Sequence, residues 1–253
     1  MVERVGARSV GRLLDVPANR YGLVHERPVG DAERRVVIVM KPTHTGIGAA
    51  ALGVKDHCGW AMLVAVGGVV EAPQVLLRER VTLLADPSLP DQPYHAAAGL
   101  GIDAAGELIA RVEHAARTAA RDALGTAALE LTKAGHDVLG VALDLGAVGA
   151  GRMRLPDNLA EVLGKHHYLH GAEGQLYHEA LMEAARDAGL AVSRYDFKAL
   201  RDTATQVLGP GVVGRVDGLR AQVGTPWTRD HKDAALAALL VLDAEEAASE
   251  DRP

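Results

Sequence analysis

The sequence predicts an α/β fold in which a mixed β-sheet is flanked by helices. Two apolar segments, residues 59–66 and 74–84, have strand patterns and are separated by a turn that contains Gly67 and Gly68. Segments with helical and strand patterns then alternate as far as residue 242. A hairpin followed by alternating helices and strands combines antiparallel and parallel pairs in one sheet and packs the helices on it.

The first elements come from short-range patterns. Residues 43–51 are rich in Gly, Thr and Ala, and we expect them to form a connection. The run 59–66 is apolar throughout, as in a buried strand, whereas polar and apolar residues alternate in the middle of 74–84. These two segments are predicted to pair as an antiparallel hairpin. Three prolines make residues 86–93 a loop.

The later elements alternate in type. Helices are predicted at residues 104–133 (broken or bent near Gly125), 159–188 (with Gly189 as C-cap), 199–208 and 227–242. Short strands are predicted at residues 137–143 and 191–195, and a Gly/Pro loop at residues 209–214.

The chain of 253 residues suits one sizeable domain with short appendages. We expect an irregular or loosely packed leader at residues 1–47, in which residues 35–40 could form a strand. The domain itself is predicted at residues 48–243, followed by an acidic, disordered tail at residues 244–253. The net charge of −6 gives nucleic-acid binding no support, although the predicted leader is net basic.

A single cysteine, Cys58, excludes an intramolecular disulfide and fits a reducing cytoplasm, where we expect the protein to reside. Cys58 is more consistent with a small apolar filler than with a nucleophile. No apolar run approaches the roughly 18–20 residues needed to cross a bilayer, so no membrane association is predicted.

Two acids begin the last predicted helix in the motif DHKD. Asp230 and Asp233 are three residues apart and therefore share a helix face. Paired carboxylates are typical ligands of a hard divalent cation such as Mg²⁺. The alternative is that they complement the helix dipole, with Thr225 or Thr228 as the cap.

Two further acids adjoin predicted strands. Asp144 follows the strand at residues 137–143, and the carboxyl ends of parallel strands line the usual site edge of an α/β sheet. Asp144 could instead start a turn. Asp56 precedes the strand at residues 59–66, where it could be a metal ligand or a capping residue.

The predicted helix at residues 159–188 carries polar groups where its apolar stripe should continue. His166, His170 and Glu173 fall on the face predicted to point inward, and buried polar groups are either partnered or functional. They could bind a metal, donate protons or form a subunit contact. Equally, His170 and Glu173 could be a satisfied buried pair. HExxH, Walker and GxGxxG motifs are absent.

Three pieces of the second half resemble RuvC-type Holliday-junction resolvases of the RNase H-like superfamily. They are HDVLGVALD, the helical stretch that begins LAEVLGKHHYLHGAEGQLYHEAL, and DHKDAALAALLVL. The resemblance implies an RNase H-like fold and four clustered acids that hold two divalent ions, Mg²⁺ or Mn²⁺, for phosphodiester hydrolysis. By that resemblance Asp144, Asp230 and Asp233 are metal ligands.

The first half departs from the family pattern, which opens with a D-x-G strand. The segment GVKDHCGWAML keeps Asp56, the candidate for the fourth catalytic and metal-binding acid, but only two residues separate it from Gly59. The leading hypothesis is a metal-dependent nuclease on branched or single-stranded nucleic acid, working as a homodimer. One alternative is an inactive RNase H-like module that binds nucleic acid or a protein. Another is a small-molecule enzyme built around His170, Glu173 and Asp56.

Overall fold

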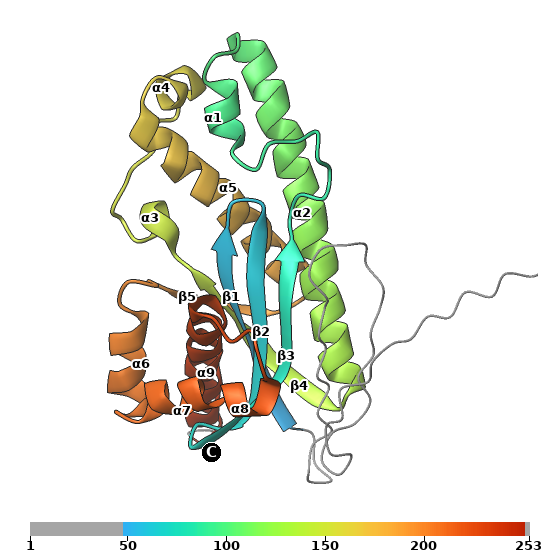
Figure 1. Cartoon of the computed structure of the whole chain (residues 1–253), viewed down its shortest axis with the longest axis vertical. Coiled ribbons are helices and arrows are strands. Elements are labelled where there is room, and N and C mark those ends of the chain that lie inside the picture. Colours follow the sequence, from blue (N-terminus) through green and yellow to red (C-terminus); the bar gives the residue numbers. More distant parts are fainter. Residues whose placement is uncertain (1–47, 251–253) are drawn as a thin grey trace, which may run out of the picture.

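A five-stranded mixed sheet forms the centre of the molecule (Figure 1). The structure, a computed structural model, describes residues 48–250, with side chains through residue 244. The strands are β1 (Gly48–His57), β2 (Trp60–Val69), β3 (Ala72–Thr82), β4 (His136–Asp144) and β5 (Ala191–Tyr195). Their order across the sheet is β3-β2-β1-β4-β5, with β2 antiparallel to both neighbours and β4 and β5 parallel to β1. The predicted mixed sheet flanked by helices is confirmed.

Helices cover both faces of this sheet. They are α1 (Pro93–Ala97), α2 (Ile102–Lys133), α3 (Gly146–Gly149), α4 (Leu159–Leu163), α5 (His166–Asp187), α6 (Leu200–Leu208), α7 (Val212–Gly218), α8 (Arg220–Val223) and α9 (Arg229–Glu250). The long helices α2 and α5 pack on one face and against each other, whereas α9 packs on the opposite face with α6 and α7 beside it. Figure 1 shows α1 and α4 at one end of the long helices, beyond the tips of the strands.

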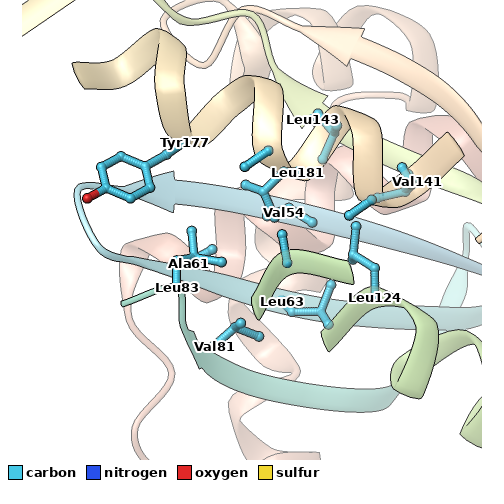
Figure 2. Close-up of a cluster of buried hydrophobic side chains, with 14 of the residues drawn as sticks. Val54, Ala61, Leu63, Val81, Leu83, Leu124, Val141, Leu143, Tyr177 and Leu181 are labelled. Carbon is cyan, nitrogen blue, oxygen red and sulfur yellow. The ribbon is translucent and has the colours of Figure 1, made fainter. Parts of the chain in front are cut away.

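The face under α2 and α5 forms the first of two buried cores. Figure 2 shows Tyr177 and Leu181 of α5 and Leu124 of α2 close to strand residues such as Val54 and Leu63. The buried positions of α2 include four alanines, which bring this helix close to the sheet without large side chains. The low aromatic content of the sequence is therefore consistent with a tightly packed core.

The second core depends on a close approach of α9 to β1. A Cβ atom at Gly53 would overlap the backbone carbonyl of Ala234, so only glycine fits at this position of the strand. The six residues from Ala234 to Leu239 are completely buried. This contact fixes the first turns of α9, and with them Asp230 and Asp233, over the end of β1.

The first strand differs from the prediction. Residues 43–51 were expected to be a connection, but β1 begins at Gly48 and pairs with both β2 and β4. Its glycine and alanine residues have low intrinsic strand propensity, yet the strand is central and covered on both faces, so tertiary packing decides its conformation. The predicted hairpin is therefore the second half of a three-stranded meander, and Cys58 and Gly59 form the tight turn before it.

Several predicted helix limits also change. The helix expected at residues 159–188 is divided into α4 and α5 at Gly164, and α2 is unbroken at Gly125. The loop predicted at residues 209–214 gives way to α7 at Val212, and α9 continues through Glu250, beyond the expected end at residue 242. The leader at residues 1–47, the strand expected at 35–40 within it, and residues 251–253 of the tail lie outside the described residues. Within residues 48–250, no helix has both the length and the apolar character to cross a membrane.

Candidate functional site

The predicted acids meet at one edge of the sheet. Because β1, β4 and β5 are parallel, their carboxyl ends lie together, and α9 begins at the same edge. Tyr195, the last residue of β5, lies among them and donates a hydrogen bond to the Val54 carbonyl at 2.8 Å. Burial raises the pKa of its hydroxyl well above the ordinary value, and the charges of Asp56, Asp144, Asp230 and Asp233 all raise it further. Tyr195 therefore lies close enough to all four acids to be influenced by their charges.

A lysine that the sequence analysis did not single out lies at the centre of this edge. The Nζ atom of Lys55 is 2.9 Å from Oδ2 of Asp144, and the two side chains are only 14% and 4% exposed. Lys55 also lies over the ring of Phe197, with Nζ 4.5 Å from the ring centroid. The other carboxylate oxygen of Asp144 accepts the Gly146 N–H at 3.0 Å. Both oxygens of Asp144 thus have partners within the chain.

Asp233 is likewise neutralised by cations. Two guanidinium nitrogens of Arg201, Nε and Nη2, donate to its Oδ1 at 3.2 and 3.0 Å, and Nε of Arg229 donates to its Oδ2 at 3.3 Å. Asp233 is buried, whereas both arginines keep part of their surface in solvent. Charge-assisted hydrogen bonds of this kind satisfy a buried carboxylate without a metal ion.

Asp230, one turn earlier on α9, faces a histidine. Nε2 of His57 lies 3.3 Å from Oδ2 of Asp230, and the His57 ring stacks on Trp60 with the ring centroids 4.0 Å apart. Burial lowers the pKa of His57, and the carboxylate of Asp230 opposes this shift. The start of α9 is held by Thr228, whose N–H and hydroxyl both lie within hydrogen-bond distance of Nδ1 of His231.

Asp56 lies on the other face of β1. Side chains alternate along a strand, so Asp56 shares a face with Val54, which packs under α2 and α5, whereas Lys55 shares a face with Gly53, which packs under α9. Burial raises the pKa of Asp56, and the charges of Lys55 and, to a smaller extent, His178 on α5 partly oppose this shift. Burial in turn lowers the pKa of His178. Asp56 thus points toward α5 and away from the layer that holds the other three acids.

This arrangement does not fit a shared two-metal site. Among the residues that the structure describes, no three carboxylates bring oxygen atoms within 4.8 Å of one another. A basic side chain lies against each of the three acids on the α9 face, which are Asp144, Asp230 and Asp233. The roles of Asp56, Asp144, Asp230 and Asp233 as metal ligands stay a prediction.

Comparison with solved structures finds a similarity to RuvC. A structure titled as Thermus thermophilus RuvC in complex with a Holliday junction substrate has a TM-score of 0.45 and 14% sequence identity, and the match covers 79% of this chain and 96% of that one. A second Thermus thermophilus RuvC structure has a TM-score of 0.43 and 15% sequence identity, and this match also covers 79% of this chain and 96% of that one. No protein-family model and no curated protein matches the chain. These values are too low to transfer the activity or partners of RuvC to this chain.

The polar residues of α5 form a second cluster away from that edge. Glu173 is buried as predicted, with 1% of its surface exposed, but His166 and His170 are exposed and do not face the core. The reason is that α5 begins at His166, so its first turns extend past the sheet. Glu173 does not pair with His170. Its Oε1 instead accepts hydrogen bonds from the N–H and Nδ1 of His95 on α1, at 3.1 and 2.8 Å.

Sequence reasoning missed Lys55, His95 and Arg201. Lys55 had a usable signal, because it immediately precedes Asp56 in an extended segment and must therefore face the opposite side of the strand. His95 lies just after the predicted loop at residues 86–93, with no pattern that ties it to α5. Arg201 is 32 residues from the acid it binds, and no local pattern links the two.

Proposed function

We propose that this chain is a non-catalytic RNase H-like module that binds nucleic acid without cutting it. The observation that carries the proposal is the Lys55–Asp144 ion pair at the carboxyl edge of the sheet. A partly buried ammonium group lies beside the acid that a metal-dependent nuclease of this fold would use to hold a cation. The predicted nuclease is the alternative that the experiment below distinguishes.

Electrostatic repulsion supports the proposal that no metal ion binds beside Asp144. Two like unit charges 4 Å apart repel by about 4 kcal/mol near a protein surface, and a divalent cation doubles this value. The ion would also compete with an ammonium group that already lies 2.9 Å from the carboxylate. Asp233 supports the same reasoning, because Arg201 and Arg229 use both of its oxygens.

Nucleic acid is the partner class that the same edge favours. The side chain of Arg229 is 74% exposed and that of Arg201 is 37% exposed, so both guanidinium groups reach solvent beside the buried acids. Lys198, in the connection after β5, is also exposed. Cations at the rim of a neutralised site can contact phosphate groups, which supply most of the affinity of sequence-independent binding.

The test separates binding from cleavage on the same substrates. Labelled four-way junctions, single-stranded DNA and single-stranded RNA are incubated with the full chain in Mg²⁺ or Mn²⁺, and binding is followed by fluorescence anisotropy over a range of salt concentrations. We expect an affinity that falls steeply with salt and no cleavage product. Cleavage over several turnovers that is lost in Asp144→Asn would establish the nuclease instead.

A matched pair of variants locates the binding surface. Arg229→Ala should reduce the dependence of log affinity on log salt by about one unit if Arg229 contacts a phosphate. Lys133→Ala removes an exposed cation at the end of α2, beside the start of β4 and therefore at the opposite edge of the sheet, and should change neither affinity nor slope. Equal effects of the two substitutions would place binding elsewhere, and no salt-dependent binding of any substrate would refute the proposed partner class.

A further inference from the structure

We propose that His95, His166 and His170 bind one divalent transition-metal ion, with zinc as the best fit. Each residue offers one ring nitrogen, and the three nitrogens all lie within 4.8 Å of one another. No other group of three metal-ligating side chains within residues 48–244 satisfies this distance. The site lies where α1 meets α5, and it does not depend on the function proposed for the acidic edge.

The ring arrangement suits a common cation. The centroid of His95 is 5.1 Å from that of His166 and 4.6 Å from that of His170, and the latter two centroids are 4.7 Å apart. His166 and His170 are four residues apart on α5, so both project from the same side of the helix. Tetrahedral zinc with bonds of about 2.0–2.1 Å needs nitrogens roughly 3.4 Å apart. Small rotations of the two exposed rings can supply that approach.

Glu173 prepares His95 for this role. Because Nδ1 of His95 lies 2.8 Å from the Glu173 carboxylate, it carries the proton of the ring, and Nε2 is left to bind the ion. A carboxylate that accepts the second ring N–H of a metal-bound histidine is a recurrent feature of protein metal sites. The backbone N–H of His95 donates to the same oxygen at 3.1 Å, which fixes the position of the residue as well as its ring.

The burial of Glu173 is an independent indication of a missing positive charge. Its side chain is 1% exposed, and its Oε2 atom is buried with no hydrogen-bond partner among the described residues. Within that part of the chain, its one ion-pair partner is His95. A buried carboxylate is costly unless a cation compensates it. An ion bound to the far side of the His95 ring supplies this charge.

The donor set selects the class of metal. Three imidazole nitrogens suit Zn²⁺, Co²⁺, Ni²⁺ and Cu²⁺, whereas Mg²⁺ and Ca²⁺ require oxygen ligands. His166 and His170 are exposed, so the fourth coordination position is open to water. A response to zinc but not to magnesium therefore belongs to this cluster and not to the acids at the sheet edge.

The experiment uses the full chain without an affinity tag, freed of metal with a chelator. Isothermal titration with ZnCl₂ should give one ion per chain, MgCl₂ should give no heat of binding, and the visible spectrum of the Co²⁺ form should be that of a tetrahedral complex. His166→Ala and His170→Ala should each weaken zinc binding by more than the 10–100-fold that loss of an outer partner causes. His167→Ala is the matched control, because its exposed ring contacts Tyr168 outside the cluster, and it should leave affinity unchanged.

Glu173→Gln tests the positioning role separately from ligation. It should keep one ion per chain but weaken zinc binding by about 10–100-fold, because the ring of His95 loses its charged partner. If this buried variant does not fold by circular dichroism, the two exposed histidine variants still decide the proposal. The proposal is overturned if zinc does not bind in a one-to-one ratio, or if binding survives in His166→Ala and His170→Ala.

Discussion

Substitution of Lys55 by methionine removes the ammonium group that neutralises Asp144. The carboxylate would stay 4% exposed and would keep only the Gly146 N–H as a partner. Breaking a buried ion pair by removing one partner costs about 3–5 kcal/mol, because the other charge is left uncompensated. Lys55 itself is 14% exposed, so some water reaches the pair, and we expect a loss near 3 kcal/mol in the free energy of unfolding.

The double variant Lys55→Met/Asp144→Leu replaces both charged side chains by apolar side chains of similar length and branching. Such replacements are often neutral or stabilising, so the double variant should be more stable than the single Lys55→Met variant. The control is Arg121→Met, which breaks the ion pair with Asp187. Because both partners in that pair are about half exposed, the expected loss is about 0–1 kcal/mol.

Urea unfolding followed by circular dichroism gives the four free energies, and repeating it with Mn²⁺ links them to the proposed function. In Lys55→Met no ammonium group lies beside Asp144. Mn²⁺ that binds there should therefore raise the free energy of unfolding of this variant, and more so the more tightly it binds. It should leave the parent chain unchanged. The proposed role of Lys55 is refuted if Lys55→Met lowers the free energy of unfolding by less than about 1 kcal/mol, or if Mn²⁺ stabilises the parent chain equally. In either case the Lys55 ammonium group does not replace a metal ion beside Asp144.

Three shorter predictions follow from other contacts. Gly53→Ala forces α9 away from the sheet and should lower the free energy of unfolding, measured in a urea titration, by at least the roughly 1–3 kcal/mol of an overpacked core. Gly125 has open space around it, so Gly125→Ala should stabilise α2 by about 0.5–1 kcal/mol. Burial raises the pKa of the Cys58 thiol to about 11, so alkylation by iodoacetamide at pH 8 should be roughly 100-fold slower in the native protein than in urea. Burial also raises the pKa of Asp56, so the folded state binds the proton of this carboxyl group more tightly than the unfolded chain does. The folded state therefore loses stability as pH rises above about 4. Asp56→Asn should stabilise the fold at pH 7, and this gain should disappear toward pH 4.

The parts of the fold that could be predicted are those with a strong local pattern. The strands β4 and β5 and the helices α2 and α6 end within about two residues of the predicted limits. The strand β1 has no such pattern, because its glycine and alanine residues suit a strand only when helices cover both faces. Its conformation is decided by contacts with β2, β4 and α9, which lie far away in the sequence.

In the candidate sites, too, local patterns could be predicted and contacts between distant residues could not. The gathering of Asp144, Asp230 and Asp233 at one edge could be predicted, because strand ends and helix starts follow from chain order. Their partners could not, since Lys55 lies 89 residues from Asp144. Likewise, His95 lies 78 residues from Glu173, and no periodic pattern spans such a distance.

The alternation of β1 decides which charged side chain of this segment lies beside Asp144. In the sequence Lys55-Asp56, the lysine faces α9 and the acid faces α5, because successive side chains of a strand point to opposite faces. A shift of one residue would place Asp56 beside Asp144 and move the lysine to the other layer. The presence of an acid in this segment is therefore not enough to predict a metal site. The residue on the face that α9 covers is the one beside Asp144, and here it is the lysine.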